Sequence, residues 1–137
     1  DNLVEFANGE VRCSFGESGR GTDVFIMQTH YGVDGRSVND SIMEHLIMID
    51  AASRASAKRI TAVVPLYGYA RQERKAAGRE PITARLAAEM VQAGGAKRRS
   101  ANELHCGQMQ GFCERPVYHR TAWPLREGSR RQNASTR

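Results

Sequence analysis

The sequence predicts an α/β domain in which a parallel sheet is flanked by helices. Residues 24–27 are a continuous apolar run, as expected of a strand that is covered on both faces, and residues 60–66 predict the best buried strand in the chain. Each run is followed by a loop and then by a segment with helical periodicity, and such strand–helix repeats are typical of a parallel sheet covered by helices. At 137 residues the chain is long enough for one domain with a hydrophobic core.

Two turns and a short strand precede these repeats. Residues 5–9 predict a turn, because Asn8 and Gly9 are a pair that tolerates the left-handed backbone conformation. Residues 11–15 alternate in polarity and predict a short strand, and a second turn is expected at residues 17–21.

The first predicted helix follows a polar loop at residues 30–38. Ser37 or Asn39 can cap its start, and the helical pattern reaches about residue 57. Apolar residues recur there at three- and four-residue spacing and give the helix one apolar face, which comprises Ile42, Met43, Leu46, Ile47 and Ile49.

The second predicted helix begins at Pro81, which suits the first helical position, and ends at Gly94 and Gly95. Its inward stripe is expected to consist of Leu86, Met90 and Val91. A further buried strand should follow, but residues 97–103 contain one apolar residue in seven, and burying this run would leave several charges without partners. Residues 108–112 are expected to be ordered. The domain is thus assigned to residues 1–124, and residues 125–137 to a disordered basic tail.

Charge is unevenly distributed along the chain. The net charge is +5, yet residues 1–96 carry 11 Lys and Arg against 12 Asp and Glu, whereas residues 97–137 carry nine against three. A basic tail can bind nucleic acid, but only Phe112, Tyr118 and Trp123 are present there to stack on bases, so nucleic-acid binding is not favoured.

The protein is expected to be cytoplasmic and to make no membrane contact. No apolar run approaches the length that spans a bilayer, and residues 1–5 lack the cationic and apolar regions of a signal peptide. The three cysteines form an odd and sparse set, which agrees with a reducing compartment.

The strongest functional signal lies in residues 67–85, the loop between the second buried strand and the second helix. This loop holds five cations opposed by two carboxylates, namely Arg71, Arg74, Lys75, Arg79 and Arg85 against Glu73 and Glu80. Open α/β sheets bind ligands at charged loops that follow a parallel strand, and these cations suit a nucleotide phosphate. The alternative is a solvated loop at the entry of a helix, because charged runs are more often solvated surface.

Four stretches of the chain are similar to one known family. They are residues 6–10 (Phe-Ala-Asn-Gly-Glu), residues 17–21 (Glu-Ser-Gly-Arg-Gly), residues 67–85 with Tyr-Ala-Arg-Gln-Glu-Arg-Lys and Arg-Glu-Pro-Ile-Thr-Ala, and residues 104–112 with Leu-His and Gln-Met-Gln-Gly-Phe. The chain resembles the N-terminal domain of ribose-phosphate pyrophosphokinase (phosphoribosyl pyrophosphate synthetase) over residues 5–124. The resemblance implies a phosphoribosyltransferase-like domain, incomplete at both ends. It also implies an enzyme of nucleotide biosynthesis that transfers the diphosphoryl group of ATP to ribose 5-phosphate with Mg2+.

The resemblance assigns nucleotide contacts to two of these stretches. In the family the first stretch binds adenine across a subunit boundary, which implies that Phe6 stacks on the ring while Asn8 and Glu10 meet its polar edge. Without the resemblance, the same stretch would be a hairpin turn with Phe6 in the core. Arg71 and Gln72 are implied to hold the phosphates and ribose of ATP. The family also implies a homo-oligomer, a hexamer.

A metal residue and a regulatory turn are implied as well. His105 would serve the magnesium site through water, because Mg2+ prefers oxygen ligands and keeps several waters. Ser18 and Arg20 match a turn that binds phosphate or ADP as a regulator in the bacterial enzymes.

No catalytic residue is expected in this chain. The family binds ribose 5-phosphate at an acidic pair followed by Thr-Gly-Gly, which the sequence lacks, and it carries its catalytic Lys and Arg in a second domain. The chain is therefore predicted to be inactive alone. Two other functions stay open: a non-catalytic regulatory subunit of a synthetase complex, and a nucleic-acid binder that uses the basic tail.

Overall fold

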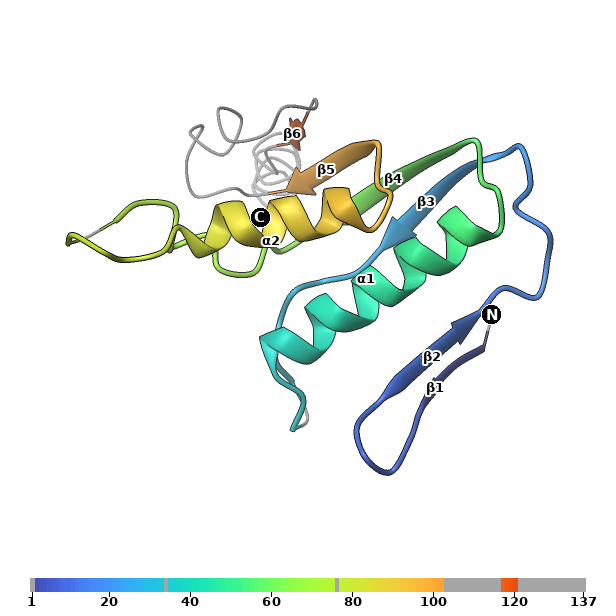
Figure 1. Cartoon of the computed structure of the whole chain (residues 1–137), viewed down its shortest axis with the longest axis horizontal. Coiled ribbons are helices and arrows are strands. Elements are labelled where there is room, and N and C mark those ends of the chain that lie inside the picture. The colour runs from blue at the N-terminus through green and yellow to red at the C-terminus, as the bar shows by residue number, and fades with distance from the viewer. Residues whose placement is uncertain (1, 34, 76, 103–116, 121–137) are drawn as a thin grey trace, which may run out of the picture.

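The fold consists of a parallel sheet, two helices and a separate hairpin, in a computed structural model that describes residues 2–33, 35–75, 77–102 and 117–120. The elements follow in the order β1 (Asn2–Glu5), β2 (Val11–Ser14), β3 (Asp23–Met27), α1 (Val38–Arg54), β4 (Arg59–Val64), α2 (Thr83–Ala93), β5 (Arg98–Asn102) and β6 (Val117–Arg120). The strands β3, β4, β5 and β6 lie side by side in that order and are all parallel, whereas β1 and β2 form an antiparallel hairpin (Figure 1). The predicted α/β class is confirmed.

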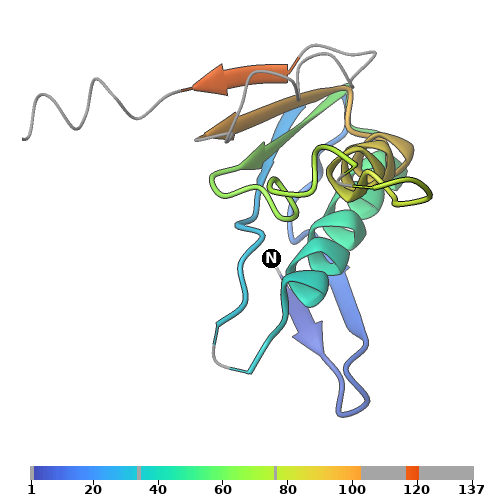
Figure 2. The same cartoon turned by 90° about the vertical axis from the view of Figure 1, so that its left-hand side faces the viewer.

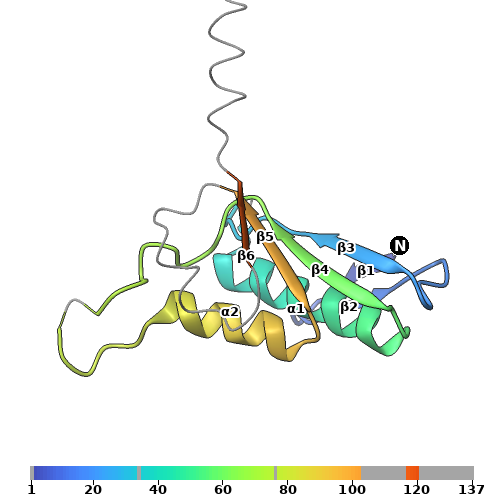
Figure 3. The same cartoon turned by 90° about the horizontal axis from the view of Figure 1, so that it is seen from above.

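The described elements form three layers. Both helices lie against one face of the sheet (Figure 3), and the hairpin lies on the side of α1 that faces away from the sheet (Figure 2). On the other face of the sheet Phe25 and Met27 are 70% and 68% exposed, because alternate residues of a strand point to opposite faces. The prediction that residues 24–27 are covered on both faces is therefore wrong for the described part of the chain.

The core lies between the sheet and the helices. One cluster joins Ile26 and Ile60 of the strands to Ile49 of α1 and Val91 of α2. A second cluster joins Val64 and Tyr67 to three alanines of α2. Burying these apolar side chains provides the main favourable term for folding.

The buried face of α2 differs from the prediction. It consists of Ala84, Ala87, Ala88 and Val91, whose spacing places them in one stripe. Leu86 and Met90, predicted to point inward, are 51% and 37% exposed. Alanine lets the helix approach the sheet closely, so the small residues occupy the contact face and the large ones lie outside it.

The helix termini partly match the predictions. Ser37 caps α1 as predicted, with its hydroxyl accepting from the Asp40 N–H at 3.2 Å while the Asp40 carboxylate accepts from the Ser37 N–H at 2.6 Å. The helix ends at Arg54 rather than near residue 57, because Ser56 adopts a left-handed conformation (φ 61°). The start of α2 is Thr83 rather than Pro81, whereas its predicted end at Gly94 is confirmed. None of the described helices combines the length and apolarity needed to cross a membrane.

The polar run after α2 does form a strand. Residues Arg98–Asn102 pair with β4 on one side and β6 on the other, and the Arg98 side chain is exposed, so pairing the backbone does not bury this charge. The turn predicted at residues 5–9 is confirmed as the tip of the β1–β2 hairpin. Residues 108–112, predicted to be ordered, and the predicted disordered tail lie outside the described residues.

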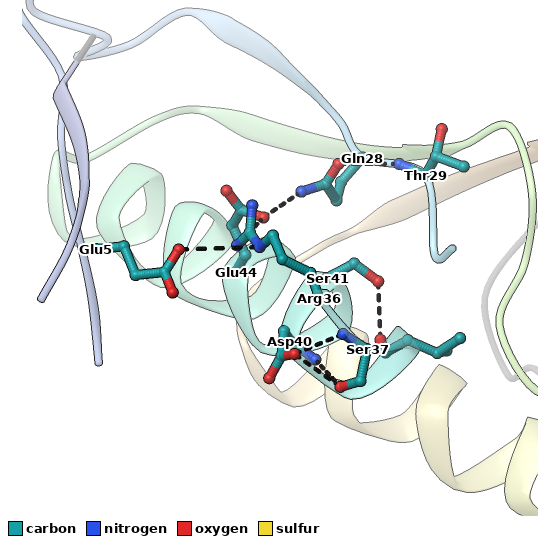
Figure 4. Close-up of polar contacts among 9 residues, drawn as sticks. Glu5, Gln28, Thr29, Arg36, Ser37, Asp40, Ser41 and Glu44 are labelled. Carbon is teal, nitrogen blue, oxygen red and sulfur yellow. Dashed lines mark hydrogen bonds and ion pairs between the residues drawn. The ribbon is translucent and has the colours of Figure 1, made fainter. Parts of the chain in front are cut away.

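A buried carboxylate connects the loop after β3, the hairpin and α1 (Figure 4). The Glu44 side chain is 4% exposed and accepts from Arg36 Nη2 at 3.0 Å and from Gln28 Nε2 at 2.7 Å. Arg36 Nε also lies 3.9 Å from the Glu5 carboxylate. Within the described residues, this ion pair is the only polar contact between the hairpin and the rest of the fold.

Two histidines are buried in the interior, His30 in the loop after β3 and His45 in α1. His45 Nε2 lies 3.3 Å from the Ile26 carbonyl, which only accepts, so this nitrogen carries the proton. His45 Nδ1 then accepts from His30 Nε2 at 3.0 Å, which leaves His30 Nδ1 as an acceptor with no partner within the described structure. The pKa of both imidazoles is lowered from 6.5 to about 4, chiefly by burial and, for His30, also by the proximity of His45, so both are neutral near pH 7.

Arg36→Ala is expected to lower the free energy of unfolding by about 1–3 kcal/mol, because the Glu44 carboxylate stays buried without its cation. Arg54→Ala is the matched control, since Arg54 forms an exposed ion pair with Asp50 at 2.7 Å one helical turn away. Its expected cost is below about 0.5 kcal/mol. Urea unfolding at pH 7 measures both, and equal losses would contradict the role of the buried pair.

Stability is expected to fall as the pH is lowered from 6.5 towards 4, because the unfolded histidines titrate near 6.5 and the folded pair near 4. Between these values the unfolded state binds more protons, so each proton costs about 1.4 kcal/mol per pH unit. Asp40 titrates below this window, because hydrogen bonds from Ser37 hold the pKa of its carboxyl below 3.8.

Urea unfolding across this pH range tests the effect. His45→Gln is the comparison, since an amide can accept from His30 and donate to the Ile26 carbonyl without titrating. A smaller pH slope is expected for this variant, and an unfolding free energy independent of pH in the wild-type chain would rule the effect out.

Candidate functional site

The loop that follows β4 lies where the parallel strands end at their carboxyl termini. The strands β3 and β4 run in the same direction, and each is followed by a helix that begins at this edge of the sheet. The loop starts beside the N-terminal end of α1 and extends beyond the N-terminal end of α2 (Figure 1). This edge is the usual ligand site of open α/β sheets, and the N–H groups of helix N-termini favour anions there.

The start of the loop packs tightly on the body of the domain. Tyr67 is buried, and its hydroxyl donates to the Ala84 carbonyl at 3.4 Å. Residue 68 must be glycine, because a Cβ there would lie 2.9 Å from the His30 Cβ and 3.0 Å from Val38 Cγ1. The backbone at position 68 thus rests directly on the first turn of α1.

A turn at residues 69–72 presents the predicted phosphate-binding pair. The Gln72 N–H donates to the Tyr69 carbonyl at 2.8 Å, and the Gln72 carbonyl accepts from the Ala84 N–H at 3.3 Å. The second bond satisfies an N–H in the first turn of α2, which has no side-chain cap. The side chains of Arg71 and Gln72 are exposed and make no polar contact within the described structure. Both are therefore free to meet a ligand.

Tyr69 also fixes this turn to α1. Its hydroxyl donates to the Asn39 side-chain oxygen, 30 positions earlier in the chain. The backbone of Tyr69 is left-handed (φ 59°), which costs a residue with a Cβ about 1–2 kcal/mol. Neither contact was predicted. A glycine between two tyrosines was the available signal for close packing, but no local pattern pairs position 69 with position 39.

Several charges of the loop already have partners in the chain. Glu80 accepts from the Ala77 N–H at 3.0 Å, and Arg85 pairs with Glu89 at 2.7 Å within α2. Glu73 and Arg74 are also engaged with other groups. Arg71 is thus better placed to bind an anion than Arg74 or Arg85.

The hairpin tip presents the residues predicted to bind adenine. The Phe6 N–H donates to the Glu10 carbonyl and the Gly9 N–H to the Phe6 carbonyl, both at 2.8 Å, and Gly9 has φ 84°. Asn8 Oδ1 accepts from the Glu10 N–H at 3.1 Å. Phe6 is 47% exposed, so the alternative that places it in the core is wrong.

A pocket of about 750 Å³ separates the hairpin from α1. This volume falls in the range of about 300–1,000 Å³ that is usual for small-molecule sites. The lining includes Phe6, Glu10, Arg12, Arg36, Met43 and Ile47. The Arg36 that pairs with Glu44 is thus one of several charged residues that line this pocket.

The structure does not bring the two predicted nucleotide motifs together within one chain. The hairpin tip and the turn at residues 69–72 lie apart in Figures 1 and 3. The predicted regulatory turn is separate as well, because Ser18 and Arg20 precede β3 and so lie at the amino end of the sheet. Both residues are exposed, and the Ser18 hydroxyl accepts from the Arg20 N–H at 3.4 Å.

The predicted metal residue is not placed by the structure, because His105 lies outside the described residues. Within the described ranges no three His, Cys, Asp or Glu side chains gather closely enough to hold a metal ion. The magnesium site thus stays a prediction.

Comparisons with known proteins identify the family of the chain. The family model for the N-terminal domain of ribose phosphate pyrophosphokinase matches residues 2–95. The chain is 51% identical over 121 residues to the ribose-phosphate pyrophosphokinase of Streptomyces coelicolor, covering 88% of this chain and 36% of that protein. It is 50% identical over 129 residues to the Mycobacterium leprae enzyme of the same name, covering 94% of this chain and 38% of that protein.

A solved structure shows the same fold. The crystal structure of phosphoribosylpyrophosphate synthetase from Mycobacterium smegmatis superposes with a TM-score of 0.86 at 48% identity, covering 93% of this chain and 42% of that one. The chain thus spans little more than a third of the length of its curated relatives. The chain belongs to the ribose-phosphate pyrophosphokinase family and corresponds to its N-terminal domain.

Proposed function

We propose that this chain forms the ATP-holding part of a ribose-phosphate diphosphokinase, which transfers the diphosphoryl group of ATP to the 1-hydroxyl of ribose 5-phosphate. The observation that carries the proposal is the turn at residues 69–72, which holds Arg71 and Gln72 exposed at the carboxyl edge of the sheet. A guanidinium at this edge can make forked, charge-assisted hydrogen bonds to phosphate oxygens. Phosphoryl transfer depends chiefly on such positioning and charge neutralisation.

In this proposal the hairpin supplies the other part of the nucleotide site. The exposed Phe6 ring stacks on adenine, and Asn8 and Glu10 meet its polar edge. The separation of the hairpin from residues 69–72 supports a site shared between two copies of the chain, and hence a homo-oligomer. The hexamer implied by the family is one such assembly.

Magnesium, regulation and cellular location belong to the same proposal. Mg2+ would enter with the ATP phosphates and neutralise part of their charge, with His105 serving its site through water. Ser18 and Arg20 would bind a regulatory phosphate or ADP, and the protein would act in the cytoplasm. The two alternatives from the sequence, a regulatory subunit and a nucleic-acid binder, stay open, and the basic tail of the second lies outside the described residues.

Arg71→Ala is expected to weaken binding of MgATP by about tenfold or more, since a charge-assisted hydrogen bond contributes about 1.5–3 kcal/mol. Arg54→Ala is the control, because Arg54 is exposed, pairs with Asp50 and lies at the opposite end of α1 from the loop. Isothermal titration of the 137-residue chain measures both. Equal affinities in wild type and Arg71→Ala would remove the assigned role.

The isolated chain is expected to form no AMP from ATP and ribose 5-phosphate. Its sequence lacks the acidic pair followed by Thr-Gly-Gly that the family uses to bind ribose 5-phosphate. Chromatographic detection of AMP, with a full-length synthetase as the positive control, checks this expectation. Turnover by the purified chain above the background of a mock purification would refute it.

A further inference from the structure

We propose that Tyr69 is a positioning residue for the phosphate-binding pair, and that it acts through its hydrogen bond to Asn39. The inference rests on the proposed function, because it concerns how Arg71 and Gln72 are held for ATP. Tyr69 itself is not assigned a contact with the nucleotide.

The side chain of Tyr69 links two elements that approach this edge of the sheet separately. Its hydroxyl donates to the Asn39 oxygen, and Asn39 lies in the first turn of α1. The backbone of the preceding residue already rests on the same helix, since a Cβ at Gly68 would lie 3.0 Å from Val38 Cγ1 and 3.2 Å from Ile42 Cδ1. The loop therefore has two adjacent attachments to α1, one through its backbone and one through a side chain.

The backbone of Tyr69 carries the restraint to the functional pair. Its carbonyl accepts from the Gln72 N–H at 2.8 Å, which closes a turn with Ala70 and Arg71 as its central residues. The Ala70 side chain packs against the core cluster beneath. With residue 69 fixed by its hydroxyl and residue 72 fixed through its carbonyl to the Ala84 N–H, Arg71 has little backbone freedom.

The left-handed backbone of Tyr69 points to the same role. A φ of 59° is unfavourable for a residue with a Cβ, and such a conformation persists only where surrounding contacts hold it. The hydroxyl bond to Asn39 and the turn bond to Gln72 are those contacts. Loss of the hydroxyl should therefore loosen the turn without disturbing the core, because Tyr67, not Tyr69, belongs to the core cluster.

The test compares Tyr69→Phe, Asn39→Ala and the double variant with the wild-type chain. Tyr31→Phe is the matched control, since Tyr31 is an exposed tyrosine on the neighbouring loop and its hydroxyl makes no contact within the described structure. Asn39→Ala does not weaken α1 itself, because alanine favours helix more than asparagine does. Urea unfolding of each variant confirms an intact fold.

Two properties are measured for each variant, amide exchange and ligand affinity. The exchange rate of the Gln72 amide hydrogen, measured by NMR without nucleotide, reports whether the turn is held. The dissociation constants for MgATP and for adenosine separate phosphate positioning from base binding. Loss of one hydrogen bond predicts about three- to tenfold faster exchange and about three- to tenfold weaker MgATP binding, with adenosine binding unchanged.

The double variant should be no weaker than either single variant, because both substitutions remove the same bond. The proposal is overturned if Tyr69→Phe matches Tyr31→Phe in Gln72 exchange, or if it binds MgATP as tightly as the control does. Full additivity of the two substitutions would overturn it as well. If the wild-type chain binds no MgATP, the proposed function fails, and Gln72 exchange alone decides whether Tyr69 holds the turn.

Discussion

The close approach of the chain to α1 at position 68 is the constraint on which the functional edge depends. With no side chain at Gly68, the loop leaving β4 lies directly on His30 and Val38. A larger residue would push the loop off the helix, and the Tyr69 hydroxyl would then no longer reach Asn39. The turn that presents Arg71 is thus a consequence of packing one position earlier. Glycine is required here for its small size rather than for backbone freedom.

Two successive residues of α1, Glu44 and His45, are buried in different charge states. Glu44 is buried as an anion because Arg36 supplies a cation and Gln28 a further donor. His45, the next residue, has no anion assigned to it and instead meets a carbonyl and another imidazole, so burial keeps it neutral. Glu44 thus needs a cation beside it, whereas the histidine pair must stay unprotonated. A proton added to the pair at His30 Nδ1 creates a buried cation with no neighbouring anion among the described residues, whereas removal of the Arg36 cation leaves the Glu44 carboxylate unpaired.

Local patterns were sufficient to predict the elements whose structure is locally determined. The cap at Ser37, one of the two residues predicted for this role, and the buried strand β4 follow from residues adjacent in sequence. The buried face of α2 was mispredicted, because hydrophobicity ranks Leu86 and Met90 above alanine, while the close helix–sheet contact selects for small size.

The candidate site was predictable only in part, because some of its contacts join residues far apart in the sequence. Its charged residues could be located because charge, glycine and a preceding strand are visible in the sequence, as at Arg71. The residues that hold them could not, since the Tyr69–Asn39 bond joins positions 30 apart. A left-handed tyrosine also contradicts local preference, and it exists only because tertiary contacts impose it.

The hairpin and the turn at residues 69–72 are held to the rest of the domain in different ways. Its tip exposes Phe6, and within the described residues its only polar contact with the body is the ion pair between Glu5 and Arg36 at 3.9 Å. An exposed pair at this distance contributes little, about 0–1 kcal/mol, so the packing of β2 against α1 holds the hairpin more than this ion pair does. By contrast, the turn at residues 69–72 is fixed to both helices. Backbone and side-chain hydrogen bonds to two helices thus hold the turn at residues 69–72, whereas the hairpin is held by its packing on α1 and by one exposed ion pair.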